Sequence, residues 1–132
     1  MRLFVDRDLG KRLPRALQTV GQDATAHIER YPRADAETVE DRAWIHEAAT
    51  RDELILTRDG GVRRRDVEIA AIAAARARCI VLETGNATPF VYLRAVMIAW
   101  PKIERLVADQ APPWVYGLNR DGRLVCRYPR PQ

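Results

Sequence analysis

The stretch LILTRDGGVRRR, residues 54–65, decides the fold class. Four apolar or β-branched residues run into an Arg-Asp pair, two glycines and, after Val62, three consecutive arginines. A short apolar run that stops at turn-forming residues is typical of a strand buried on both faces, as in a parallel sheet covered by helices. We therefore expect a buried strand at residues 53–57, the carboxylate of Asp59 just beyond its end, and a loop through residue 65.

The same pattern recurs along the chain. Apolar runs at residues 2–6 and 79–83 also predict strands, and residues 23–28 predict a weaker one. Helical spacing predicts helices at about 9–20, 38–51 and 66–78 and a long helix from residue 88. Strands that alternate with helices predict a three-layer α/β/α fold around a small parallel sheet with right-handed crossovers. Residues 112–129 predict a C-terminal β-hairpin, with Asn119–Gly122 as its turn.

Length and composition bound the class of protein. The 132 residues are 47% hydrophobic and 30% charged, so we expect a single domain over residues 1–132, with its core at about 2–110. Lys and Arg number 22 against 18 Asp and Glu, and the basic and acidic residues are separated along the chain. Such separation suits a protein that meets a polyanion, although an unevenly charged solvated surface would look the same.

The chain carries no signature of export or of a membrane. Cys79 and Cys126 form neither a metal-ligand spacing nor a disulfide framework, and Cys79 is expected to be a small buried residue. No apolar run approaches the ~18 residues of a membrane span, and the charged N-terminal residues do not resemble a signal peptide. We therefore expect a cytoplasmic protein.

Acidic residues follow the predicted strands. Asp6, Asp59 and Glu83 lie at or just past strand ends, and in open parallel sheets the ligand site lies beyond those ends. Asp41 lies near the start of the helix at 38–51, in helical register with Ala48, so we expect it on the apolar side of that helix. A buried carboxylate there would need a cation, an arginine or a metal as its partner.

Together these carboxylates predict a metal site. Asp6, Asp41 and Asp59, with Asp8 close by, would form the all-oxygen cluster that Mg²⁺ or Mn²⁺ prefers. Such an ion activates water and stabilises the charge that develops on a phosphodiester during in-line attack. The basic residues that flank the same edge would hold a nucleic-acid backbone, and they are Lys11, Arg12, Arg63, Arg64 and Arg65.

Each candidate also has a plain structural explanation. Asp59 could be an ordinary turn residue, Asp8 a helix cap, and Glu83 part of a loop. The arginine run could be solvated. His27 and His46 have no partner spacing, and we expect both to be structural or exposed.

Four segments carry a family resemblance. LFVDRDLGKRLPRAL, DRAWIHEA, LILTRDGGVRRR and IVLETGN occur in this order, and their spacing resembles that of PIN-like nuclease domains. The chain is similar to the compact branch represented among toxins of VapBC toxin–antitoxin systems, over roughly residues 2–110. The resemblance implies a three-layer fold and Mg²⁺- or Mn²⁺-dependent RNA cleavage with Asp6, Asp41 and Asp59 as the acids. For the family's further acid it leaves two candidates, Asp8 as a ligand and Asn86 as a residue lining the pocket.

The resulting hypothesis is a metal-dependent endoribonuclease, the toxin of a type II pair, with RNA and a cognate antitoxin as partners. Two assemblies stay open, because the apolar C-terminal hairpin could pack on its own domain or meet a second copy in a homodimer. One alternative is a catalytically degenerate PIN-like domain that binds nucleic acid or protein without cleavage. Another is a receiver domain, which also clusters aspartates around Mg²⁺, but residues 79–86 are not followed by the lysine that receivers require.

Overall fold

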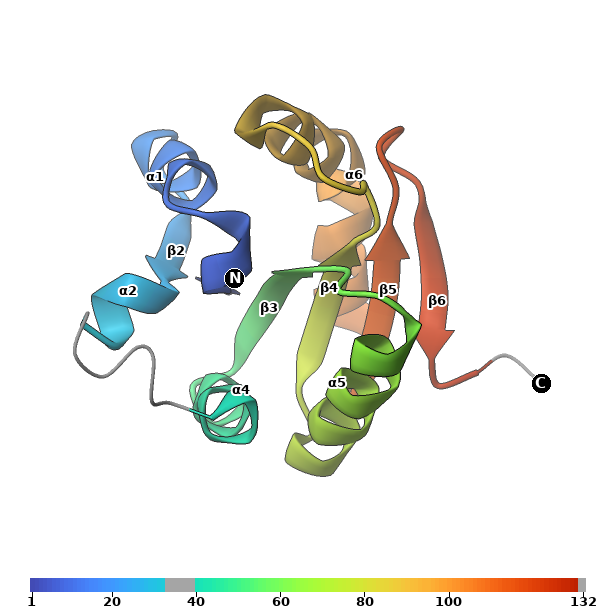
Figure 1. Cartoon of the computed structure of the whole chain (residues 1–132). Helices are drawn as coiled ribbons and strands as arrows, with labels where there is room; N and C mark the ends of the chain where they lie inside the picture. The colour runs from blue at the N-terminus through green and yellow to red at the C-terminus, as the bar shows by residue number, and fades with distance from the viewer. Residues whose placement is uncertain (33–39, 131–132) are drawn as a thin grey trace.

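The computed structural model describes residues 1–32 and 40–130, apart from the side chains of residues 62–64. Within them the chain alternates strands and helices (Figure 1). The strands are β1 (Arg2–Val5), β2 (Asp23–Ala26), β3 (Glu53–Arg58), β4 (Arg78–Leu82), β5 (Trp114–Leu118) and β6 (Leu124–Tyr128). The helices are the 3₁₀ turn η1 (Arg7–Leu9), α1 (Arg12–Thr19), α2 (His27–Arg30), α4 (Asp41–Thr50), α5 (Val62–Ala75) and α6 (Pro89–Asp109).

The strands form one sheet in the order β2-β1-β3-β4-β5-β6. The first five are parallel, and β6 pairs antiparallel with β5. The predicted parallel sheet and C-terminal hairpin are therefore confirmed. The hairpin is not an appendage, however, because β5 pairs along its whole length with β4 and continues the parallel sheet.

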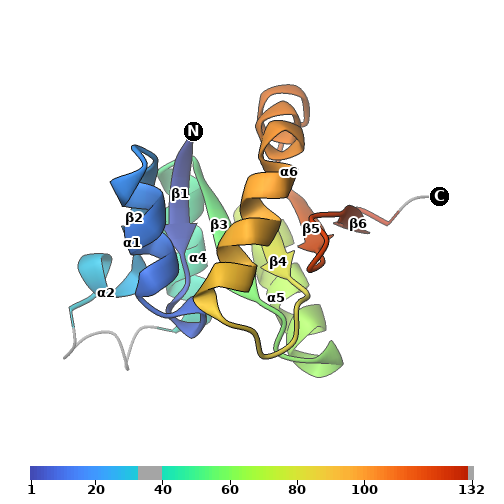
Figure 2. The ribbon, with the colours of Figure 1, turned by 90° about the horizontal axis from the view of Figure 1, so that it is seen from above.

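Both faces of the central strands β1, β3 and β4 are buried, which explains why these strands are continuous apolar runs. Successive side chains point to opposite faces, so Leu54 and Leu56 pack on one side and Ile55 on the other. Helices α1 and α6 cover the first side, and α4 and α5 cover the second (Figure 2). The predicted three-layer α/β/α architecture is confirmed.

One crossover differs in hand from the others. The strands step in the same direction from β3 to β4 and from β4 to β5, yet α5 and α6 lie on opposite faces. The β4–α6–β5 connection therefore has the opposite hand to β3–α5–β4, so the prediction that every crossover is right-handed was wrong. The physical reason is burial of the second face of the sheet. Helices α4 and α5 already cover one face, so α6 crosses on the other face and buries the apolar residues of β3 and β4 there.

Helix boundaries follow local chemistry. Helix α6 begins as predicted, because Thr88 accepts a hydrogen bond from the Val91 N–H and Pro89 occupies the first turn. Helix α5 begins at Val62 rather than Asp66, directly after Gly61, whose φ of 99° favours glycine. The arginine run therefore lies in the first turns of a helix and not in a loop.

The buried side of α6 also differs from expectation. Helical spacing predicts one apolar side for this helix, made of Phe90, Leu93, Met97, Trp100 and Val107, yet Phe90 and Met97 are 69% and 49% exposed. The residues that face the sheet are Tyr92, Ala95, Val96, Ala99 and Ile103. These residues belong to the same buried cluster as Leu54 and Leu56 of β3 and Ile80 and Leu82 of β4.

In the part of the chain that the structure describes, no helix is both long enough and apolar enough to span a bilayer.

Candidate active site

The carboxyl ends of the parallel strands place four polar residues along one edge of the sheet. His27 follows β2, Asp6 follows β1, Asp59 follows β3 and Glu83 follows β4. Their backbones are joined across the strands, since Asp6 N–H donates to the Leu56 carbonyl and Asp59 N–H to the Leu82 carbonyl. This is the edge at which open α/β sheets bind ligands.

Asp6 and Asp8 meet at one hydroxyl group. Asp6 is only 4% exposed, and its Oδ2 accepts a hydrogen bond from Thr57 Oγ1 at 2.8 Å. The same hydroxyl lies 3.3 Å from Asp8 Oδ2. The other Asp6 oxygen accepts from the Arg7 N–H at 2.7 Å, which caps η1. The 3₁₀ turn thus brings two acids, two residues apart in sequence, to the end of β3.

His27 lies beside these acids and is buried, with an exposed fraction of 2%. Its ring packs against Phe4, Tyr31 and Trp44 at centroid distances of 5.0–6.2 Å. Burial lowers the pKa of His27, and the negative charges of Asp6 and Asp41 oppose that shift. Its Nδ1 is buried and has no hydrogen-bond partner among the described residues.

Asp41 is the first residue of α4 and is exposed. The helix buries Trp44, Ile45 and Ala48, but its first turn projects beyond them. The expectation of a buried carboxylate was therefore wrong for this residue. Its Oδ1 accepts a hydrogen bond from Trp44 Nε1 at 3.0 Å, which fixes the side chain beside the aromatic group that contains His27.

Asp59 and Glu83 are bound by arginines. Asp59 pairs with Arg65 through Oδ2 and accepts from the Gly61 N–H at 3.0 Å through Oδ1. Glu83 accepts a two-nitrogen fork from Arg127, with distances of 3.0 and 2.7 Å. That contact raises the pKa of the Arg127 guanidinium. Arg127 lies on β6, so the C-terminal hairpin contributes directly to this edge.

The predicted nucleic-acid-binding residues separate into three groups. Lys11 and Arg12 are exposed at the start of α1, on the chain segment that follows η1. Arg65 is paired with Asp59 and is not open to solvent in the way the sequence suggested. The side chains of Arg63 and Arg64 lie outside the described residues. Asn86, which the resemblance suggested as a pocket residue, is exposed in the loop between β4 and α6.

The donor chemistry fits a hard divalent cation only in part. Asp6 and Asp8 supply converging carboxylate oxygens, the ligands that Mg²⁺ and Mn²⁺ prefer. Among residues 1–32 and 40–130, however, no three Asp, Glu, His or Cys side chains lie close enough together to hold a metal ion. Asp59 is engaged by Arg65, and Asp41 by Trp44. The structure thus assembles two members of the predicted cluster and holds the other two apart.

Sequence reasoning missed two residues of this edge and underrated a third. Thr57 was seen as the end of a strand and Arg127 as part of a hairpin, while Glu83 was weighed as a loop residue. One signal was available, because Gly117 interrupts an apolar strand and such a glycine often marks a close approach. A Cβ at Gly117 would lie 2.4 Å from the Glu83 carboxylate, so the glycine makes room for that side chain.

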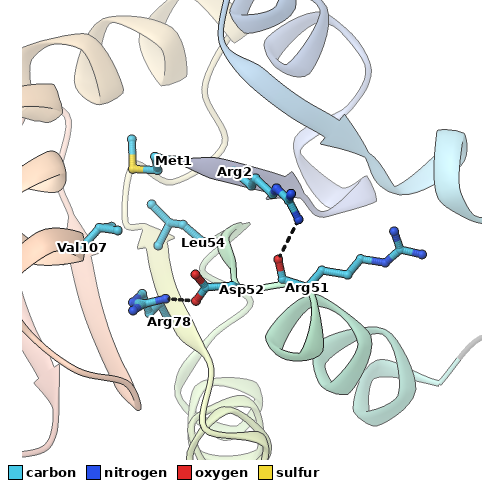
Figure 3. A pocket seen from close by; sticks show the side chains of 7 residues that line it. All are labelled: Met1, Arg2, Arg51, Asp52, Leu54, Arg78 and Val107. Carbon is cyan, nitrogen blue, oxygen red and sulfur yellow. Dashed lines mark hydrogen bonds and ion pairs between the residues drawn. The ribbon is translucent and has the colours of Figure 1, made fainter.

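Two hollows lie near these elements. One of about 360 Å³ is lined by residues at the amino ends of the strands, including Arg2 and Arg78, and Figure 3 shows Arg78 paired with Asp52 there. It is at the opposite edge from the acids. The other, of about 980 Å³, runs between α4 and α5 over an alanine-rich floor and is lined at one end by Asp41. Only the second hollow adjoins a candidate acid.

Comparisons with known proteins agree with this architecture. The chain is 33% identical over 110 residues to a protein of Mycobacterium tuberculosis named "Putative ribonuclease VapC45", a match that covers 83% of this chain and 72% of that protein. No solved structure matches significantly. The family model described as "PIN like domain" matches residues 1–84, which include β1 to β4 and all the acids discussed above. The chain therefore belongs to the PIN-like domain family.

Proposed function

We propose that the protein is a metal-dependent endoribonuclease and the toxin of a type II toxin–antitoxin pair. The observation that carries the proposal is the convergence of Asp6 and Asp8 on the Thr57 hydroxyl, at the ligand-binding edge of a PIN-like sheet. The similarity to a mycobacterial protein named as a ribonuclease supports RNA as the substrate.

Each residue of the edge has a role in this proposal. Asp6 and Asp8 would hold Mg²⁺ or Mn²⁺, with Asp59 and Asp41 as further acidic residues of the site. The ion, when bound, supplies an acidified water and neutralises charge on the phosphodiester. Thr57 fixes the orientation of the Asp6 carboxylate by its hydrogen bond.

Substrate binding would use the exposed cations nearby. Lys11 and Arg12 lie at the start of α1, on the same chain segment as Asp6 and Asp8. Contacts of this kind hold the backbone of RNA without selecting its sequence. Binding should therefore weaken as salt rises.

The test is RNA cleavage by purified protein with Mn²⁺ or with EDTA. We expect cleavage with Mn²⁺ and none with EDTA, and we expect Asp6→Asn and Asp59→Asn to lose cleavage while keeping the native circular dichroism spectrum. Asp23→Asn is the matched control, since Asp23 is exposed at the amino end of β2, away from the acids. Full cleavage by both site variants would refute the mechanism.

The pairing of Asp59 with Arg65 favours one alternative, a PIN-like domain that binds RNA or protein without cleaving it. RNA that binds wild-type protein but stays intact in Mn²⁺ would support it.

For the toxin, we propose an antitoxin that covers the acidic edge with an Arg or Lys side chain. The hollow between α4 and α5 supports this partner, because its apolar floor runs up to Asp41.

A further inference from the structure

The hollow at the amino ends of the strands carries more positive than negative charge on its walls. It holds about 360 Å³, and its charged lining residues are Arg2, Arg51, Asp52 and Arg78. Arg51 pairs with Glu47 of α4 at 2.8 Å, and in Figure 3 its side chain points away from the other lining residues. The guanidinium groups of Arg2 and Arg78 therefore face this amino-end hollow with the carboxylate of Asp52 as the opposing charge.

The charge of Arg2 is available to a ligand. Its Nη1 donates to the Arg51 carbonyl at 3.4 Å, and no ion pair of Arg2 occurs among the described residues. A contact to a neutral carbonyl at this long distance is a weak hydrogen bond. Because a guanidinium has five N–H donors, most of those of Arg2 remain free for an anion.

Arg78 is held in place but is incompletely satisfied. Its side chain is only 14% exposed, and its Nη1 pairs with Asp52 Oδ1 at 2.5 Å. Its Nε is buried and has no hydrogen-bond partner in the part of the chain that the structure describes. A carboxylate that engages an arginine fully takes two nitrogens as a fork, so Asp52 uses only part of what Arg78 can donate.

Asp52 is a partner that an incoming anion can displace. Its side chain is 82% exposed, so the carboxylate is already hydrated and loses little when it leaves Arg78. Arg2 and Arg78 both contact the turn formed by Arg51 and Asp52, as Figure 3 shows. An oxyanion at this turn gains two positive partners, whereas Asp52 has one.

The remaining walls of the hollow are apolar. They are formed by Leu54 of β3, Val107 of α6 and the side chain of Met1. The volume lies within the range of about 300–1,000 Å³ that is typical of small-molecule sites, so there is room for an organic group beside the anion. A phosphate monoester suits both parts, because it carries about two negative charges at pH 7 and arginine binds phosphate oxygens well.

We propose that the amino-end hollow binds a phosphate monoester the size of a mononucleotide. Arg2 and Arg78 hold the phosphate, Asp52 is displaced from Arg78, and the organic group contacts the apolar walls. The hollow is at the opposite edge of the sheet from Asp6 and Asp8, so the proposal goes beyond the nuclease and does not depend on it.

The experiment is isothermal titration of the 132-residue chain with adenosine 5′-monophosphate (AMP), in EDTA so that no divalent cation bridges the phosphate. We expect saturable binding with a dissociation constant below about 1 mM, weaker binding of inorganic phosphate, and no binding of adenosine. Arg78→Gln and Arg2→Gln should each weaken AMP binding about tenfold or more, because each removes a charge-assisted hydrogen bond. Asp52→Asn should tighten it about fivefold, the effect of removing one negative charge about 4 Å away in water.

The gain expected for Asp52→Asn keeps the test independent of folding. Asparagine tolerates the φ of 56° at this position, and a damaged fold would not bind AMP more tightly. Arg94→Gln is the control, because Arg94 is an exposed arginine near the other end of α6 from Val107, and it should leave the affinity unchanged.

The proposal is overturned if AMP does not bind, if adenosine binds equally well, or if the Arg2, Arg78 and Asp52 variants bind AMP as the wild type does. A 5′-phosphorylated RNA trinucleotide identifies the source of the phosphate: displacement of AMP by it assigns the hollow to RNA ends, and no displacement assigns it to free mononucleotides. Asp6→Asn should bind AMP normally, so the nuclease and this site can fail separately.

Discussion

Replacing Thr57 with valine removes the hydroxyl that joins the two acids while keeping the shape of the side chain. Thr57 is 2% exposed, and its Oγ1 is the donor to Asp6 Oδ2 at 2.8 Å. In the variant, buried Asp6 would keep the Arg7 N–H but lose this second donor. A hydrogen bond to a charged group contributes about 1.5–3 kcal/mol, so we expect the free energy of unfolding to fall by about that amount. For a chain of this length, the melting temperature should drop by roughly 5–15 °C.

Urea and thermal unfolding in EDTA measure this loss without any contribution from a bound ion. Thr19→Val is the matched control, because Thr19 is exposed and its hydroxyl donates to the Arg15 carbonyl at 2.8 Å within its own helix. We expect the control to change stability by less than about 0.5 kcal/mol. If Thr57→Val loses no more stability than Thr19→Val, the hydroxyl does not stabilise the Asp6 carboxylate and our account of the site is wrong.

Three further predictions follow from buried ionisable groups. Arg30 and Glu53 form a two-nitrogen fork at 2.5 and 2.6 Å, and their side chains are 9% and 5% exposed. Arg30→Met should therefore lower the free energy of unfolding, measured in urea, by about 3–5 kcal/mol. A loss below about 1 kcal/mol would contradict burial of the pair. Burial lowers the pKa of His27 below its usual 6.5. As the pH falls, the imidazole is therefore protonated in the unfolded chain before it is protonated in the folded protein. Stability should therefore fall as the pH drops from 7 to 5, and His27→Phe, unfolded in urea at both pH values, should show a shallower fall; an equal slope would refute this. Burial raises the pKa of the Cys79 thiol well above its usual value, so a disulfide reagent at pH 8 should label Cys126 in the native protein but label Cys79 only after unfolding.

The sequence by itself determined the sheet and one edge of it. Runs such as residues 53–57 and 79–83 are apolar on both faces, which is typical of a parallel sheet covered by helices on both sides. The ends of the runs at residues 2–6 and 53–57 place Asp6 and Asp59 at the same edge. The start of α6 was equally local, because the Thr88 cap and Pro89 act within one helical turn.

Local patterns could also mislead. Helical spacing placed Asp41 on the apolar side of its helix and Phe90 in the core, yet both are exposed. Spacing gives the direction of a side chain relative to its own helix, but burial depends on where the helix ends relative to the sheet. The arginine run was also predicted to lie in a loop, with the helix beginning at Asp66. Helix α5 instead begins at Val62, directly after Gly61.

Only the tertiary structure decided which groups the acids meet. Asp6 and the Thr57 hydroxyl are 51 residues apart in sequence, and Glu83 and Arg127 are separated by 44. These contacts exist because β1 lies beside β3, and because β5 extends the sheet so that β6 reaches Glu83. A hydrogen bond needs its two groups within about 3 Å. The propensity or periodicity of one segment does not say where a segment 44 or 51 residues away lies in space, so these contacts could not be predicted from local patterns.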